Sequence, residues 1–138
     1  MAAGAVMSDD RPGRRERATA VVLRGGSVLL VREAGVPYYS LPGGGVHEGE
    51  SAAAAAAREV REELGLAALR VERLEECDHA GFMNDHRVCL VEASPGEPRL
   101  AGHELDGFCW WDRTEPLALH PHVTAILSNM ARAGRMGP

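Results

Sequence analysis

Three glutamates, Glu59, Glu62 and Glu63, crowd together in the segment REVREEL. On a helix, like charges three or four residues apart repel mildly, so such a face needs either full solvation or a positive partner. Converging carboxylates also raise one another's pKa unless cations neutralise them. Ligation by oxygen alone suits Mg²⁺ or Mn²⁺, which share their coordination with water and substrate phosphates. The spacing therefore indicates a divalent-metal site, with a solvated acidic face as the alternative.

The segment that carries these glutamates has the features of an α-helix. Ser51 is a favourable N-cap, the following alanines are strong helix formers, and Gly65 is placed to end the helix, which is predicted to span residues 52–64. Arg58 precedes Glu62 by four residues and can pair with it. The face predicted to pack on a sheet comprises Ala53, Ala57, Val60 and Leu64.

The rest of the chain mixes strands and helices without a regular βαβ repeat, which favours a mixed sheet with helices packed on its faces. Residues 17–33 are typical of two strands joined by a turn at Gly25-Gly26. A single domain is expected over residues 17–138, preceded by a flexible leader at 1–16. Further elements are predicted as strands at 66–78, 87–94 and 107–113, loops at 79–86 and 94–106, and a helix at 120–133.

The composition excludes several classes of site. The chain has 138 residues, and all 15 of its basic residues are arginine, which rules out lysine Schiff-base chemistry and a phosphate-loop lysine. Cys77, Cys89 and Cys109 form no CxxC pair, so we expect reduced thiols rather than a zinc site or a disulfide framework. The net charge of −5 disfavours a stable nucleic-acid partner. No apolar run approaches the roughly 20 residues that span a membrane, and we expect a cytoplasmic protein.

The stretch from Gly44 to Leu66 resembles the signature of the Nudix hydrolases. That signature is a glycine, five residues, a glutamate, seven residues, and then R-E-U-x-E-E-x-G-U, where U is a bulky aliphatic residue. Every defined position matches over these 23 residues. The segments YYSLPGGG and ELDGFCWWDRTEPLALHP are similar to regions that flank the signature in the family. The family often has an acid two residues before the glycine–glutamate pair, here Gly49-Glu50, and this chain departs slightly in having His47 there, with Glu48 after it.

The resemblance implies an α/β/α sandwich with a mixed sheet and a catalytic loop–helix–loop. It also implies Mg²⁺-dependent hydrolysis of the diphosphate linkage in a nucleoside triphosphate or another nucleoside-diphosphate derivative, with Mn²⁺ as a substitute. By position, Glu62 and Glu63 are implied metal ligands together with the carbonyl of Gly43. Glu59 is implied to bind metal or to orient the attacking water, and Arg58 to hold the glutamates through salt bridges.

Residues outside the signature are candidates for substrate contacts. Gly44 and Gly45 let the backbone approach the substrate closely. Tyr39 and Phe82 are rings that can stack on a base, with core packing as the alternative. Glu104 is a candidate for the further acid that many family members recruit as base or ligand, and a plain exposed loop acid is the alternative.

The histidines carry weaker signals. His79 and His86 bracket a predicted loop and either contact phosphates or are ordinary surface histidines. His120 and His122 flank Pro121 and are expected to serve in capping or a turn.

The substrate itself stays open, because Gly81 stands where ADP-ribose hydrolases often have a proline. A small-molecule nucleotide is the expected partner, and the oligomeric state stays open between a monomer and a homodimer. A nucleotide sensor without catalysis is the alternative function, against which the intact signature argues.

Overall fold

The structure of the protein, a computed structural model, describes residues 14–136 of the chain. The predicted leader, residues 1–16, therefore lies almost entirely outside the described residues. The first strand, β2, begins at Arg15 and so includes the end of that segment.

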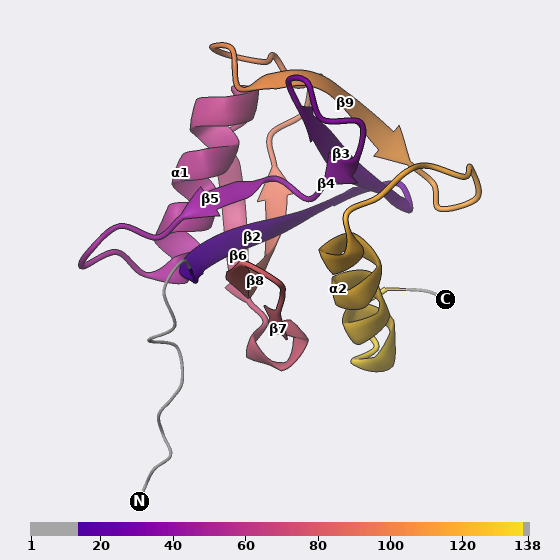
Figure 1. Cartoon of the computed structure of the whole chain (residues 1–138). Coiled ribbons are helices and arrows are strands. Elements are labelled where there is room, and N and C mark those ends of the chain that lie inside the picture. Colours follow the sequence, from indigo (N-terminus) through magenta and orange to yellow (C-terminus); the bar gives the residue numbers. More distant parts are fainter. Residues whose placement is uncertain (1–13, 137–138) are drawn as a thin grey trace, which may run out of the picture.

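One mixed sheet forms the centre of the fold, with the order β4-β3-β2-β8-β6 (Figure 1). Three further strands extend it, since β5 pairs with β2, β7 with β8, and β9 with β3. Strands β2 and β8 run parallel, and the other pairs are antiparallel. The strands are β2 (Arg15–Arg24), β3 (Ser27–Glu33), β4 (Tyr39–Ser40), β5 (Gly43–Gly45), β6 (Ala68–Arg73), β7 (His79–Ala80), β8 (Asn84–Ala93) and β9 (Leu105–Trp111).

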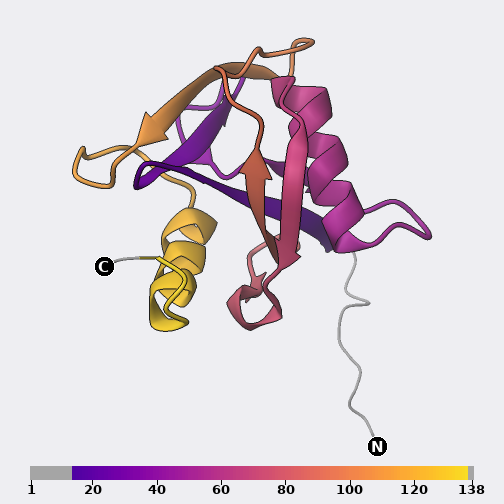
Figure 2. The same cartoon turned by 180° about the vertical axis from the view of Figure 1, so that it is seen from behind.

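Two α-helices, α1 (Ala52–Leu64) and α2 (Pro121–Arg132), cover opposite faces of the sheet (Figures 1 and 2). Side chains alternate across a strand, so β2 contributes to a separate hydrophobic core on each face. Ala18 and Ala20 pack with α1, and Val21 packs with α2. The predicted α/β/α sandwich with a mixed sheet is thus confirmed. Within residues 14–136, neither helix combines the length and the apolar character needed to span a membrane.

The predicted strand at 66–78 is too long. Strand β6 ends at Arg73, and a 3-10 helix, η1 (Glu75–Cys77), follows it. Leu74 and Cys77 are fully buried in the core on the α2 side. The chain therefore turns after Arg73 because these apolar side chains are buried beneath α2 rather than continuing along the sheet edge.

The predicted loop at 79–86 is also partly wrong, because it contains β7 and the start of β8. His79 and Ala80 pair with His86 and Asp85 in a short hairpin. Strand β8 begins earlier than predicted since its parallel pairing with β2 extends down to Asn84. This early start moves His86 from a loop into the sheet.

The three cysteines are free thiols, with Cys77 and Cys89 buried and Cys109 partly buried. Burial raises the pKa of the Cys89 thiol to about 11. The expectation of reduced thiols without a disulfide framework agrees with this arrangement.

Candidate active site

Helix α1 begins and ends where the sequence predicts. The Oγ of Ser51 accepts a hydrogen bond from the N–H of Ala54 at 3.1 Å, which satisfies one of the free donors of the first turn. Gly65 adopts a left-handed conformation, with φ of 67°, and its N–H donates to the carbonyl of Arg61. The buried face needs a correction: Ala55 and Ala56 are fully buried with Val60 and Leu64, whereas Ala53 and Ala57 are only partly buried.

The glycine loop before α1, the segment Gly43–Gly45 that pairs with β2 as β5, lies against both β2 and the helix, and a side chain on Gly43 or Gly44 would displace a neighbour. A Cβ on Gly43 would lie 2.1 Å from the carbonyl oxygen of Ala18. A Cβ on Gly44 would lie 2.4 Å from the carboxylate of Glu59. Glycine at these two positions therefore lets the loop backbone lie directly against the carbonyl of Ala18 and the carboxylate of Glu59, where another residue would place its Cβ.

Arg58 joins the loop to the acidic face of α1. Its guanidinium forms a bidentate pair with Glu50, at 2.8 and 3.0 Å, and donates to the carbonyl of Gly45 at 3.0 Å. It also donates to Glu59 at 2.8 Å and to Glu62 at 3.2 Å. These contacts confirm the expected ion pairs. The hydrogen bonds from Arg58 and from the backbone of His47 lower the pKa of Glu50 to about 2.

Among residues 14–136, no cation contacts Glu63 as Arg58 contacts Glu59. Within the same part of the chain, the Oε1 of Glu63 is buried without a hydrogen-bond partner. Burial, and then the negative charge of Glu59, raise the pKa of Glu63 to about 7. The N–H of Gly43 and the charge of Arg17 act in the opposite direction but do not compensate. A carboxylate in this position is stabilised by any cation that reaches it.

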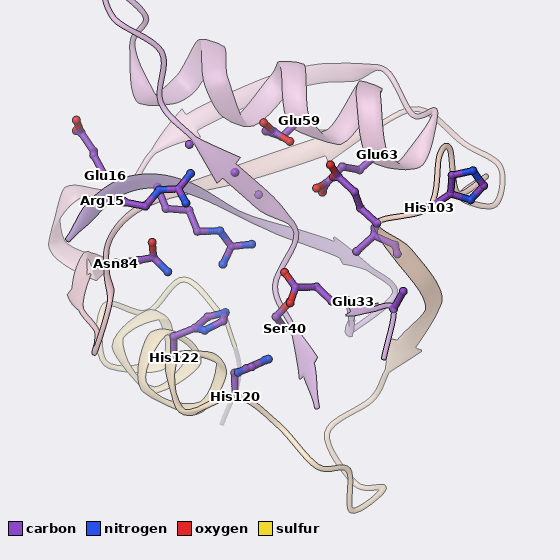
Figure 3. A pocket seen from close by; sticks show the side chains of 17 residues that line it. Arg15, Glu16, Glu33, Ser40, Glu59, Glu63, Asn84, His103, His120 and His122 are labelled. Carbon is purple, nitrogen blue, oxygen red and sulfur yellow. The ribbon is translucent and has the colours of Figure 1, made fainter. Parts of the chain in front are cut away.

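A cavity of about 770 Å³ lies beneath α1 and the glycine loop. Glu59 and Glu63 project into it from the helix, whereas His120 and His122 lie on the opposite wall, near the start of α2 (Figure 3). Arg15 also lines this space. The cavity thus joins an acidic wall to a wall of nitrogen-bearing side chains.

Glu62 is the most exposed of the three glutamates. It lines an adjoining cavity of about 490 Å³ with Glu59 and Glu63, and its side chain is 60% exposed. Among residues 14–136, no three His, Cys, Asp or Glu side chains form a ready-made cluster for a metal ion. The shared metal site of the three carboxylates therefore stays a prediction, and Nη1 of Arg58 contacts both Glu59, at 2.8 Å, and Glu62, at 3.2 Å.

The residues present nevertheless suit a divalent cation. Glu63 supplies a buried oxygen without a partner, and Glu59 lies next to it in the same cavity. The close fit of Gly44 against Glu59 holds the loop backbone beside these oxygens. Carboxylate and carbonyl oxygens are the donors that Mg²⁺ and Mn²⁺ prefer.

His86 lies in a group of stacked rings with His122 and His120, and not in a surface loop. His86 is 3% exposed, and its Nδ1 lies 2.8 Å from the Oγ1 of Thr19. Its ring stacks on His122 with 4.4 Å between centroids. The Nε2 of His122 accepts the N–H of Leu41 at 3.3 Å. Burial lowers the pKa of His86 to about 4 and that of His122 to about 2, so both rings are neutral near pH 7.

The other predicted site residues divide into two groups. Gly44 and Gly45 line the larger cavity, and Glu104 lines both cavities as an exposed side chain. Phe82 is 94% exposed and Tyr39 lies beneath the guanidinium of Arg32, and neither ring lines either cavity.

Several residues that line the larger cavity carry no strong sequence signal, among them Arg15, Arg17, Asn84 and His122. Side chains alternate along a strand, so the sequence could have shown that Arg15 and Arg17 lie on the same face of β2. The parallel register sets Arg15 beside Asn84 and Arg17 beside His86. That register joins segments about 70 residues apart, which local patterns do not reveal.

Comparison with known proteins places this geometry in a family. Residues 13–131 match the family model of the NUDIX domain. A Bacillus subtilis (strain 168) protein, described provisionally as an 8-oxo-dGTP diphosphatase, is 34% identical over 83 residues. That stretch covers 60% of this chain and 56% of the relative, so the chain matches little more than half of that protein's length.

Solved structures agree with the family match. A MutT NUDIX hydrolase from Burkholderia pseudomallei is 30% identical with a TM-score of 0.68, covering 83% of this chain and 96% of that one. A provisionally assigned Nudix family member from Chromobacterium violaceum is 29% identical with a TM-score of 0.76, covering 93% of this chain and 83% of that one. The match over most of the chain, together with the sandwich fold and the acidic helix, shows that the chain belongs to the Nudix hydrolase family.

Proposed function

We propose that the protein is a Mg²⁺-dependent pyrophosphohydrolase that cleaves the diphosphate linkage of a nucleoside triphosphate or another nucleoside-diphosphate derivative. The observation that carries this proposal is the buried, unpartnered Oε1 of Glu63 beside Glu59 in a cavity of about 770 Å³. Ligand pockets in proteins typically enclose about 300–1,000 Å³, so the cavity has room for a nucleotide. The relative described as an 8-oxo-dGTP diphosphatase supports a nucleotide substrate.

Glu59, Glu62 and Glu63, with the carbonyl of Gly43, are the proposed metal ligands. The family is generally dependent on divalent metal ions. Glu62 is exposed and its Oε1 contacts Arg58 at 3.2 Å, so rotation of its side chain can bring it to a shared ion. When bound, Mg²⁺ or Mn²⁺ neutralises the diphosphate, lowers the pKa of water and stabilises charge on the leaving phosphate.

The protein's own groups position the reactants. Arg58 holds the Oε2 of Glu59 at 2.8 Å, which leaves Glu59 fixed beside the glycine loop. Glu59 orients the attacking water and accepts its proton while the bond from phosphorus to the bridging oxygen breaks. Glu104, at the edge of both cavities, is the second candidate for this proton acceptor. The glycines at 44 and 45 admit the phosphate chain to the loop backbone.

The test is a substrate panel of nucleoside triphosphates, 8-oxo-dGTP and ADP-ribose, assayed for phosphate release and product mass with Mg²⁺ or with EDTA. The proposal predicts cleavage of at least one nucleotide in Mg²⁺ and none in EDTA. Nucleotide-induced stabilisation without any product would contradict it and would support a sensor.

The variant Glu62→Gln should abolish Mg²⁺-dependent turnover, because the neutral amide is a poor ligand for a divalent ion. The swap is nearly isosteric and the side chain is exposed, so circular dichroism and the melting temperature should not change. Glu92→Gln, an exposed glutamate on β8, is the matched control and should keep full activity. Full activity in Glu62→Gln would rule out its role as a ligand.

A further inference from the structure

Arg17 lines the larger cavity and lies on the same face of β2 as the buried Thr19. Burial lowers the pKa of Arg17, and the nearby charges of Glu63, Glu33 and Glu59 act against this effect. An arginine stays protonated at this site despite the shift. The cavity thus contains a recessed, permanent positive charge.

The guanidinium of Arg17 is largely unused by the protein. Within the described part of the chain, its hydrogen-bond partner is the carbonyl of Leu41, 2.9 Å from Nη2. None of its nitrogen atoms is both buried and unpaired, so the remaining donors open onto the cavity that Arg17 lines. An arginine carries five N–H donors in a planar fork that matches phosphate oxygens.

Arg58 provides the contrast. All five of its donors are used by Glu50, Glu59, Glu62 and the carbonyl of Gly45. It has no donor left for a substrate. The two arginines therefore differ in kind: Arg58 connects parts of the protein, and Arg17 presents free donors to the cavity.

Arg17 lies between the two walls of the cavity. Its charge lowers the pKa of Glu63 on the acidic wall and that of His122 on the opposite wall, so it is close to both. His122 is neutral, and its Nε2 is occupied by the N–H of Leu41. Figure 3 shows the glutamates and the histidines on facing walls, and a substrate that extends from one wall to the other occupies the cavity that Arg17 also lines.

From this geometry we infer that Arg17 is a substrate-binding residue that holds a non-bridging oxygen of the substrate's phosphate chain in the larger cavity. This inference rests on the proposed function and adds to it the group that binds the phosphate opposite the glutamates. Arg17 forms charge-assisted hydrogen bonds that depend on a phosphate and on no metal ligand. It therefore binds the anion even when no metal is present.

The test measures binding of inorganic pyrophosphate to the full chain in EDTA by isothermal titration calorimetry. Loss of hydrogen bonds to a charged group predicts that Arg17→Gln weakens binding by roughly tenfold to a hundredfold. Arg17→Lys keeps the charge but loses the planar fork of donors, so its pyrophosphate affinity should lie between those of the wild type and Arg17→Gln. Arg24→Gln, at the other end of β2, where the side chain contacts the carbonyls of Ser94 and Gly96, should bind like the wild type.

Melting temperatures and steady-state kinetics separate substrate binding from a structural role. If Arg17 serves substrate binding, Arg17→Gln should melt within a few degrees of the wild type without pyrophosphate but should lose the pyrophosphate-induced shift, whereas a structural role predicts a large fall in melting temperature. In Mg²⁺ its KM for the nucleotide should rise by a factor similar to the loss in pyrophosphate affinity.

Equal pyrophosphate affinity in the wild type and Arg17→Gln would overturn the inference, as would the absence of any binding to the wild type at millimolar pyrophosphate. If the wild type cleaves no nucleotide but Arg17→Gln still loses pyrophosphate binding, the proposed function fails and the anion site stands. If nucleotides are cleaved and Arg17→Gln keeps the wild-type KM and affinity, the proposed function stands and the inference about Arg17 fails.

Discussion

The substitution Glu63→Gln should stabilise the metal-free protein while it removes activity. The carboxylate of Glu63 has an ordinary pKa of 4.5, which burial and the charge of Glu59 raise to about 7 in the folded state. A group with a raised folded pKa stabilises the fold fully below pH 4.5, and this contribution is lost as the pH rises to about 7. Above pH 7, the folded protein therefore contains an unfavourable ionised carboxylate that glutamine lacks.

The size of the effect follows from the pKa. The difference between 4.5 and about 7 corresponds to at most about 3.4 kcal/mol, since one pKa unit is worth about 1.4 kcal/mol. Glu63 is only half-buried, and solvent screening reduces this value to about 1–2 kcal/mol. For a domain of this size that is a rise of roughly 3–8 °C in melting temperature. The amide oxygen of glutamine can take the place of the carboxylate oxygen that accepts the N–H of Gly43.

The assay is thermal unfolding of the wild type and Glu63→Gln in EDTA at pH 4.5 and pH 8, repeated with Mg²⁺. The variant should melt higher at pH 8, by an amount that nearly vanishes at pH 4.5. Mg²⁺ should stabilise the wild type by mass action and have a much smaller effect on the variant. A lower melting temperature of the variant at pH 8, or an equal gain at both pH values, would refute the reasoning.

Two further predictions concern the glycine loop and the buried histidines. Gly44→Ala should cost about 1–3 kcal/mol and most of the activity, because its Cβ would lie 2.4 Å from the carboxylate of Glu59. Gly45→Ala, whose Cβ would meet no atom closer than 3.6 Å, should keep the wild-type melting temperature, and equal melting of both variants would contradict the argument. His86 and His122 have pKa values lowered to about 4 and about 2, so stability should fall as the pH drops below 6.5, by up to about 1 kcal/mol per pH unit for each ring. Urea unfolding between pH 7 and pH 5 measures this slope, and His86→Gln should reduce it; an unchanged slope would show that His86 is protonated in the folded state.

Features that depend on neighbouring residues were predictable from the sequence. The limits of α1 follow from Ser51 and Gly65, whose capping interactions involve residues within one helical turn. The pairing of Arg58 with Glu62 follows from the i,i+4 spacing of the helix. Gly44 also proved to need the absence of a side chain, as its place in the signature indicated.

Features that depend on segments distant in the chain were not predictable. The parallel pairing of β2 with β8 carries His86 into the sheet, where a loop was predicted, and brings it beside Arg17. The end of β6 and the turn into η1 depend on burial of Leu74 beneath α2, which no local pattern shows. Helix spacing placed the glutamates on one face but did not reveal that, among the described residues, Glu63 has a buried oxygen without a hydrogen-bond partner whereas Glu62 is exposed.

The sequence by itself determined the acidic helix, its caps, the glycine loop and the family, because these reside in contiguous residues whose spacing follows from the geometry of one helix. Only the tertiary structure decided which groups share a cavity and how strongly they hold their protons. The raised pKa of Glu63 and the free donors of Arg17 both arise from burial against strands and loops far away in the chain. Burial is a property of packing, and packing is set when the sheet and its two helices come together.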